Sequence, residues 1–463
     1  MVHTYKLNDC FIAIDGNSGS IHLLDEITYD ILKDSEELPE LSEIIQRLNK
    51  KYPMNEIEDA YNEIIELKND DVLFTENQDL EKLAHSKNID TSVKAMCLHV
   101  SHDCNLRCEY CFASEGDYNC GRKLMSIETA KKAVDYLIKN SKGRSHIEID
   151  FFGGEPMMNF DVVKETVAYG RSLEKSIGKH FWFTTTTNGT LMNKEQIDFI
   201  NENMDNVVIS VDGRKEIHDK IRHDCAGNGS YDRIIPNAKE LVEGRNGKSY
   251  FIRGTFTAKN KDFSNDVMHL ADLGFKEISV EPVVGSGSDL YFTQADVPEL
   301  LAEYENLALK YLDRLSKGDG FRFYHFNINL YDGPCLFKRI TACGAGYEYV
   351  AVDPDGKIFP CHQFVGHDEF SIGDINIGIT KPELSKEFQQ NTIFKKPKCR
   401  DCWAKLFCSG GCHANAFFTN GSIYEPNELS CTLQKKRIEC AVMIQIKIES
   451  EKAEKEEENH VLL

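Results

Sequence analysis

Between residues 95 and 318, short runs of apolar, β-branched and aromatic residues alternate with segments whose apolar residues recur at helical spacing. One of these helical segments, SIETAKKAVDYLIKNS, begins at Ser126, a residue type that caps helix N-termini. Buried strands joined through helices form parallel sheets with right-handed crossovers. The pattern therefore predicts an α/β fold, an incomplete (β/α)6 barrel rather than the closed eight-unit form. The predicted strands are residues 97–103, 146–154, 180–187, 206–213, 250–257 and 276–283.

Residues 1–88 follow a different pattern. The segment TYKLNDCFIAIDGNSGSIHLLD predicts two or three short strands around the turns DGN and SGS, and three helical patterns follow it. We expect a small α+β unit here, joined to the barrel by the polar stretch ENQDLEKLAHSKNIDTS. The third helical pattern places on one face Ile57, Ala60, Tyr61, Ile64 and Ile65.

Helical periodicity fades from about residue 330 to 440, where cysteines become frequent. A last helical stretch, CTLQKKRIECAVMIQIKIESEKAEKEEE, ends in charged residues. Charged ends of this kind are solvated and frayed. We expect a cysteine-rich domain at residues 330–440 and a C-terminal helix and tail at residues 441–463.

The composition narrows the function classes. The chain has 463 residues, 41% of them hydrophobic, and a formal net charge of −21. This charge argues against nucleic-acid binding, which needs a cationic surface. It suits a basic peptide partner, although acidic surfaces also simply keep proteins soluble. No apolar run is long enough to span a membrane and MVHTYKLNDC lacks a secretory pattern, so we expect no membrane partner and a cytoplasmic protein.

Sixteen cysteines are many for a compartment where disulfides do not persist, so clustered thiols indicate metal or redox chemistry. Three of them, in CNLRCEYC, directly follow the first predicted strand, where the loops of a barrel carry its chemistry. These are Cys104, Cys108 and Cys111. Five scattered cysteines are expected to be small buried hydrophobes: Cys10, Cys97, Cys120, Cys225 and Cys440.

The spacing of the CNLRCEYC thiols leaves a fourth ligand position open. A structural zinc site needs four ligands, whereas a [4Fe–4S] cluster held by three cysteines keeps one iron free for a small molecule. We favour the cluster, with a zinc or structural site as the alternative. CNLRCEYC resembles the CxxxCxxC signature of radical S-adenosylmethionine (SAM) enzymes. The resemblance implies that the free iron binds the amino and carboxylate groups of SAM, whose reductive cleavage yields a 5′-deoxyadenosyl radical.

Further motifs fit this resemblance: GGEP, TTNG and SVDG end the second, third and fourth strands, and HDKIR follows. Glycines allow close backbone approach and a carboxylate suits an ammonium group, so GGEP is implied to meet the methionine amino group. The arginine of HDKIR is implied to pair with its carboxylate. Glu281 is a weaker candidate, and for Glu281 and Asp212 a strand-end turn or buried ion pair is an equal alternative. The implied SAM-binding residues are Phe112 (near the adenine), Gly153, Gly154, Glu155, Asn188, Ser210, Asp212 and Arg222.

The remaining clustered cysteines follow a second pattern. Cys343 is followed after twelve residues by Gly356 and after four more by Cys361, and CRDCWAKLFCSGGC comes later. The spacings resemble the seven-cysteine SPASM extension of radical SAM enzymes, which implies two auxiliary clusters and three [4Fe–4S] clusters in all. A zinc ribbon is the alternative. The implied ligands are Cys343, Cys361 and Cys412, with Cys335 as a possible fourth, for the first auxiliary cluster, and Cys399, Cys402, Cys408 and Cys431 for the second.

The N-terminal unit, residues 1–88, resembles a RiPP recognition element, a winged-helix-like module that binds a leader peptide by adding it as a strand to an open sheet edge. A stability or dimerisation domain is the alternative. TYKLNDCFIAID and the helix at residues 57–65 would line the groove.

With the barrel and the SPASM region, the chain resembles most closely the maturases of six-cysteines-in-forty-five-residues (SCIFF) peptides. This implies thioether bonds from Cys sulfur to a carbon of an acceptor residue, threonine in that group, within a Cys-rich precursor peptide. A one-electron reductant such as a flavodoxin or ferredoxin is implied as a partner.

The resemblance also implies an order of steps. The leader docks, the deoxyadenosyl radical removes a hydrogen from the acceptor carbon, a thiolate held on the first auxiliary cluster attacks that carbon, and the surplus electron leaves through the cluster. The alternatives are sulfatase-maturase-like oxidation of Cys or Ser, carbon–carbon cross-linking, and a zinc-bound peptide-binding scaffold without catalysis. Sulfatase-maturing relatives carry an aspartate directly after the cysteine that matches Cys361. His362 stands there in this chain and argues against aldehyde formation.

Overall fold

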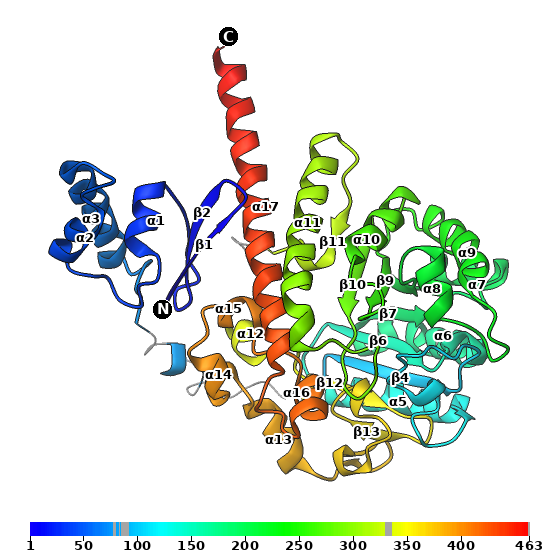
Figure 1. The fold of residues 1–463 in the computed structure, drawn as a ribbon. Helices are drawn as coiled ribbons and strands as arrows, with labels where there is room; N and C mark the ends of the chain where they lie inside the picture. The colour runs from blue at the N-terminus through cyan, green and yellow to red at the C-terminus, as the bar shows by residue number, and fades with distance from the viewer. Residues whose placement is uncertain (77–79, 83, 85–91, 329–335, 462–463) are drawn as a thin grey trace.

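The computed structural model describes residues 1–76, 80–82, 84, 92–328 and 336–461 (Figure 1). Its centre is a parallel sheet in the order β11-β10-β9-β8-β7-β6-β4. The six predicted strands are all present in this sheet, so the predicted α/β fold with an incomplete barrel is confirmed. The strands are β4 (Ala95–His102), β6 (His146–Gly153), β7 (His180–Thr187), β8 (Asn206–Ser210), β9 (Phe251–Phe256), β10 (Glu277–Pro282) and, at the edge, β11 (Arg322–Phe323).

Helices cover the outer face of this sheet (Figure 1). In α5, the Ser126 side chain accepts a hydrogen bond from the Thr129 backbone N–H at 3.0 Å, which confirms the predicted N-cap. Val134 and Leu137 of α5 belong to the same core as Ile149 of β6. The helices are α5 (Ile127–Asn140), α6 (Phe160–Ile177), α7 (Lys194–Asn203), α8 (Lys215–Ile221), α9 (Tyr231–Glu243), α10 (Phe263–Asp272) and α11 (Val297–Ser316).

The sheet continues beyond the barrel into the cysteine-rich region, which the sequence did not predict. The strand β12 (Tyr349–Val352) pairs in parallel with β4, and a short antiparallel meander follows it. The start of the cysteine-rich region is thereby hydrogen-bonded to β4, the strand that precedes CNLRCEYC. The other short strands are β5 (Lys123–Leu124), which pairs with β4, and β13 (Lys357–Phe359), β14 (Gly373–Asp374) and β15 (Gly378–Ile379).

The N-terminal module is a three-stranded antiparallel sheet in the order β1-β2-β3, covered by three helices. Ile57, Ala60 and Ile64 of the third helix are buried on the predicted face and pack with Ala13 of β2. The elements are β1 (Val2–Leu7), β2 (Cys10–Asp15), β3 (Ile21–Leu24), α1 (Glu26–Leu32), α2 (Leu41–Leu48) and α3 (Met54–Asn69).

The C-terminal region consists of short helices around the cysteines and one long helix, α17 (Glu428–Val461). This helix crosses the boundary expected at residue 441, and Cys440 to Ile444 are fully buried, so only its later part lies beyond the core. Figure 1 shows α17 between the N-terminal module and α11. The short helices are α12 (Leu336–Thr341), α13 (Pro382–Gln390), α14 (Pro397–Arg400), α15 (Lys405–Cys408) and α16 (His413–Asn420).

The N-terminal module is attached to the C-terminal region through its first strand and first turn. The His3 ring stacks on Trp403 at a centroid distance of 4.0 Å, and its Nε2 lies 2.9 Å from Oε1 of Glu439 in α17. A Cβ atom added at Gly16 would lie 2.5 Å from the Trp403 Cα, so the two backbones touch there. The contact is therefore close-packed rather than a loose tether.

The scattered cysteines differ from their prediction at two positions. Cys10, Cys97 and Cys440 are buried as expected, whereas Cys120 and Cys225 are exposed because both lie in surface loops. In the described part of the chain, no helix has an apolar stretch long enough to cross a membrane.

Candidate active site: three groups of thiols

The first group of thiols lies in the loop after β4. The backbone N–H of Arg107 donates to the His223 carbonyl at 2.7 Å, so the segment after α8 holds this loop. Burial raises the pKa of Cys104 to about 12 and that of Cys108 to about 11, and the thiol of Cys111 adds to both shifts. The three thiols therefore lie within electrostatic reach of one another, as their spacing predicted.

The GGEP turn packs directly against this loop. A Cβ at Gly153, whose φ is 127°, would lie 2.1 Å from the Ser101 carbonyl oxygen, and one at Gly154 would lie 2.2 Å from that of Asp103. Residues with side chains are excluded from both positions. The turn thus brings the end of β6 to the base of the cysteine loop.

Glu155 ties the ends of β6 and β7 together. Its buried carboxylate accepts hydrogen bonds from the backbone N–H groups of Met157 (3.0 Å) and Asn188 (2.7 Å) and from the Thr187 hydroxyl (2.7 Å). Burial raises its pKa, and these donors work against that shift. Three protein donors already surround the carboxylate, so its observed role is to fix the strand ends beside the thiols.

Asn188 completes the connection from β7. Its Nδ2 lies 2.9 Å from Asn105 Oδ1 and 3.7 Å from the Cys104 sulfur, so it borders the thiol group directly. Ser210 ends the neighbouring strand β8. Both residues lie at the carboxyl edge of the sheet, where sequence reasoning placed them.

A buried hydrogen-bonded chain runs below Cys108. Nη1 of Arg222 donates to the Tyr110 hydroxyl at 2.7 Å, and that hydroxyl donates to the Asp212 carboxylate at 2.8 Å. The charge of Arg222 lowers the pKa of Cys108 against the effect of burial. Nε of Arg222 is buried without a hydrogen-bond partner among the described residues. Sequence reasoning found Arg222 and Asp212 but missed Tyr110, whose signal was only its place between two cluster cysteines.

Aromatic rings form a wall between this site and the C-terminal region. Phe112 is 55% exposed, and its ring centroid lies 5.9 Å from that of His362. Phe152 of β6 lies 5.1 Å from His362, whose Nδ1 is 3.1 Å from the Tyr349 hydroxyl. Burial lowers the pKa of His362 to about 4, with a smaller contribution from the charge of Arg253. The imidazole is therefore neutral at physiological pH.

Charged groups occupy the side of the barrel near β9 and β10. Nη2 of Arg253 donates to Oε2 of Glu281 at 3.0 Å. Burial works to raise the pKa of Glu281, but the charges of Arg253 and His325 outweigh it and lower the pKa to about 2. The ion-pair alternative for Glu281 is thus what the structure contains, and its side chain remains 34% exposed.

The first auxiliary group brings together residues from three separate segments. The pKa of Cys361 is raised by burial and then by Cys412 and Cys343, and that of Cys343 by burial and Cys412. These three thiols therefore lie together, as the implied ligand set requires. Cys335 lies outside the described residues.

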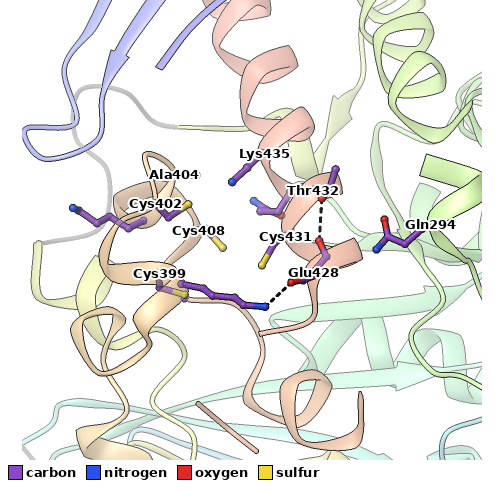
Figure 2. Close-up of a pocket in the computed structure, with 13 residues that line it drawn as sticks. Gln294, Cys399, Cys402, Ala404, Cys408, Glu428, Cys431, Thr432 and Lys435 are labelled. Atoms are coloured by element: carbon purple, nitrogen blue, oxygen red, sulfur yellow. Dashed lines mark hydrogen bonds and ion pairs between the residues drawn. The ribbon is translucent and has the colours of Figure 1, made fainter. Parts of the chain in front are cut away.

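The second auxiliary group surrounds a cavity of about 310 Å³ (Figure 2). Its thiols come from α14, the loop after it, α15 and the start of α17, and Figure 2 shows them facing one another. Burial raises the pKa of Cys399 to about 12 and that of Cys431 to about 11, and the neighbouring thiols of the set add to both shifts. The set is Cys399, Cys402, Cys408 and Cys431.

These thiols fit a cofactor of several atoms. No group of three or more His, Cys, Asp or Glu side chains among the described residues is arranged to hold a metal ion. A zinc ion needs four ligands converging at about 2.3 Å, whereas a [4Fe–4S] cube fills the space between its thiolates. A cavity bordered by four thiols, as in Figure 2, has room for a cofactor of that kind.

Comparison with known proteins agrees with these groups. Residues 98–258 match the Radical SAM superfamily, and residues 343–403 match the SPASM iron-sulfur cluster-binding domain. The chain carries a radical SAM domain followed by a SPASM domain. Radical SAM chemistry requires SAM and a [4Fe–4S] cluster, and SPASM domains bind additional iron-sulfur clusters.

The relatives of this radical SAM–SPASM chain include peptide-modifying maturases. The cysteine-type anaerobic sulfatase-maturating enzyme of Clostridium novyi (strain NT) is 28% identical over 358 residues, which are 72% of this chain and 91% of that enzyme. Native anSMEcpe with bound AdoMet and Cp18Cys peptide has a TM-score of 0.64 at 22% identity, over 76% of this chain and 98% of that one. Streptococcus suis SuiB bound to precursor peptide SuiA has a TM-score of 0.51 at 17% identity, over 92% of this chain and 98% of that one. The chain is thus homologous to peptide-modifying radical SAM maturases, and the two solved structures share its fold.

Proposed function

We propose that this radical SAM–SPASM chain forms intramolecular thioether cross-links, from Cys sulfur to a carbon of an acceptor residue such as threonine, in a ribosomally made Cys-rich precursor peptide. One observation carries the proposal. His362 follows Cys361 of the first auxiliary group, and its ring contacts that of Phe112, which follows Cys111 of the CNLRCEYC group. Two neighbouring residues thus connect a site for SAM with a site for a thiolate, and a peptide between them has its sulfur and its acceptor carbon close together.

The residues that would hold the cofactors are those of the three thiol groups. Cys104, Cys108 and Cys111 would hold the SAM-binding cluster, with SAM beside Gly154, Asn188, Ser210 and Arg222. When bound, these groups supply a 5′-deoxyadenosyl radical for hydrogen abstraction and, at the auxiliary clusters, a site for thiolate and an acceptor for one electron. The buried Nε of Arg222, which lacks a partner among the described residues, supports a role toward an anionic ligand.

The chain's own side chains favour bond formation over aldehyde formation. An imidazole whose pKa is about 4 is a weak proton acceptor at neutral pH, so His362 does not replace an aspartate as a base. Phe112, Phe152 and His362 form an aromatic surface beside the place proposed for the carbon radical. The absence of a basic carboxylate at position 362 supports sulfur as the group that captures the radical.

The N-terminal module would bind the leader of the peptide at β3. The central strand β2 is paired on both sides, so TYKLNDCFIAID cannot offer its second half as an edge. In the described part of the chain, no strand pairs with the outer side of β3. A cavity of about 720 Å³ is lined by Ser20, Ile21, His22 and Leu23 on one side and by Ile446 of α17 on the other. An added strand between β3 and α17 fits the β-augmentation mode.

Anaerobic co-expression with a neighbouring Cys-rich peptide, followed by mass spectrometry, tests the proposal. We expect a loss of two hydrogen atoms (about 2 Da) for each bridge, resistance of the bridged cysteines to alkylation, and no product from Cys104→Ala, because it removes a ligand of the radical-generating cluster. Fragmentation identifies the acceptor carbon. Aldehyde formation, detected by hydrazide labelling, or a cross-link that leaves every thiol open to alkylation would contradict thioether formation.

The reductant is tested in the same assay. With a flavodoxin or ferredoxin as one-electron donor, the purified chain is expected to cleave SAM to 5′-deoxyadenosine. Cleavage in the wild-type chain but not in Cys104→Ala confirms the radical site independently of the peptide.

A further inference from the structure

Lys396 contacts the turn at Gly410, which lies in the sequence between Cys408 of the second auxiliary thiol group and Cys412 of the first. Lys396 directly precedes α14 and is only 1% exposed. Its Nζ donates to the Gly410 carbonyl at 2.7 Å. Within the described residues, no carboxylate forms an ion pair with it. An ammonium in such a place is costly unless other anionic groups surround it.

Gly410 determines how closely this ammonium approaches the second group. Its φ is +86°, and a Cβ there would lie 3.3 Å from Nζ of Lys396. The backbone N–H of the same residue donates to the Cys408 thiol, while its carbonyl accepts from Lys396. One residue therefore separates the ammonium from a ligand of the second auxiliary cluster.

The charge of Lys396 acts on both groups. Burial lowers the pKa of Lys396, and the thiols of Cys399 and Cys408 in the second group and of Cys412 and Cys343 in the first oppose that shift. Other cations near the thiols act on the second group, namely Lys435 on Cys431 and Arg437 on Cys408. No carboxylate pairs with this buried ammonium among the described residues, so the thiolates of the two clusters would supply the negative charge that it needs.

We propose that Lys396 is a positioning residue that raises the reduction potentials of both auxiliary clusters together. The proposal rests on the proposed function only in that both thiol groups hold clusters. One-electron reduction adds a negative charge to a cluster, and the potential depends on the net charge around it. A fixed cation shared by the two clusters stabilises the reduced form of each, so it makes either cluster a better electron acceptor.

The test is an EPR-monitored redox titration of the full, reconstituted chain. The triple variant Cys104→Ala, Cys108→Ala and Cys111→Ala serves as the background, because it leaves only the auxiliary clusters visible. In Lys396→Gln, which keeps a donor for the Gly410 carbonyl but removes the charge, we expect both midpoint potentials to fall by 59 mV or more, a tenfold change in each one-electron equilibrium constant. Lys396→Arg keeps the charge and should stay near the starting values. Lys395→Met, the same loss of charge at the exposed preceding residue, is the matched control and should shift neither potential.

Each result decides the proposal. Unchanged potentials in Lys396→Gln with both clusters present, a fall in one cluster alone, or an equal fall in Lys396→Arg would overturn it. If Lys396→Gln does not retain its clusters, retention in Lys396→Arg supports a requirement for charge, and loss in both variants overturns it. Iron and sulfide content separates this outcome from failure of the proposed function, in which the background chain itself would lack two auxiliary clusters.

Discussion

Gly153 and Gly154 show why some site residues can be predicted from the sequence. Backbone oxygens lie within 2.2 Å of where their Cβ atoms would be, so a local constraint fixes the residue type and leaves a recognisable motif. The cluster cysteines are readable for the same reason, since cluster geometry fixes their spacing.

Other residues of the site carry no such local signal. Tyr110 acquires its role from Asp212 and Arg222, about a hundred residues later, and Phe152 from His362. A tyrosine or phenylalanine in an apolar run is ordinary in any strand or loop. Contacts between distant segments therefore decide these roles, and they became visible only in the folded chain.

Asp150 leads to a prediction about pH. It lies on β6 in register with Cys97 and Thr184, and burial raises its pKa to about 7, while the charge of Arg253 partly opposes the shift. Its Oδ1 is buried and has no hydrogen-bond partner among the described residues. Between pH 4 and 7 the folded chain retains a proton that the unfolded chain has lost, so the stability due to this group falls as the pH rises.

Asp150→Asn should therefore stabilise the chain more at high pH than at low pH. We expect the gain over wild type to be about 2 kcal/mol larger at pH 8 than at pH 5, from the size of the pKa shift after allowance for partial solvent exposure. Thermal unfolding of both proteins at the two pH values measures it. Asp161→Asn, the same change at an aspartate of α6 that is 88% exposed, is the control and should show no such difference. A wild-type chain that is more stable to thermal unfolding than Asp150→Asn at pH 8 would contradict this prediction.

At the scale of elements, long periodic segments were predictable and short ones were not. The six barrel strands follow from repeated apolar spacing, and the cap of α5 follows from the residue type of Ser126. The strand β12 has four residues, too few to show a period, and its parallel pairing with β4 depends on a partner about 250 residues earlier. The burial of Cys440 to Ile444 within α17 depends on packing against distant elements, which the sequence of the helix alone does not predict.

Gly16 tests the junction between the N-terminal module and the C-terminal region. In Gly16→Ala, the new Cβ would meet the Trp403 backbone at 2.5 Å, and backbone cannot rotate away as a side chain can. We expect a destabilisation of about 1–3 kcal/mol at this junction and faster proteolysis between the module and the barrel. Limited proteolysis with mass spectrometry of the fragments measures this effect.

The control for this variant is Gly143→Ala, at a glycine whose Cβ would meet nothing within 4 Å. It should be cleaved at the wild-type rate. Equal rates for Gly16→Ala and the wild type would show that the junction tolerates a separation of the two backbones.

At the scale of the whole molecule, the sequence predicted the three thiol groups but not their relative positions. Membership of each group follows from spacing, whereas the wall of Phe112, Phe152 and His362 that connects two of them joins three distant segments. The contacts of the N-terminal module with Trp403 and Glu439 also join segments that are far apart in the sequence. Placement of domains depends on such surface contacts, which leave no periodic pattern in the sequence.

Leu23 allows the proposed leader-binding role of the module to be separated from the radical chemistry. It lies on the edge strand β3 and is 57% exposed. Leu23→Asp should weaken binding of the leader peptide about tenfold, or about 1.4 kcal/mol, because an apolar contact is replaced by a charge. Fluorescence anisotropy with a labelled leader measures the affinity.

Two comparisons complete this experiment. Met54→Asp changes a side chain of the same module that is 56% exposed but belongs to α3, and it should leave leader affinity unchanged. SAM cleavage should be the same in both variants and the wild type. A loss of cleavage in Leu23→Asp, or equal affinities in the two variants, would argue against β3 as the leader site.

The helix α17 connects two of the proposed sites. Cys431, near its start, belongs to the second auxiliary group, and Glu439, eight residues further along, contacts His3 of the module. The proposed second cluster would cross-link the start of this helix, so a preparation that has lost iron to air would lack that anchor, and the proposed leader-binding surface beside α17 would be displaced with it. Affinities for substrate measured on such material would therefore underestimate those of the intact enzyme, even though no peptide-binding residue had been damaged.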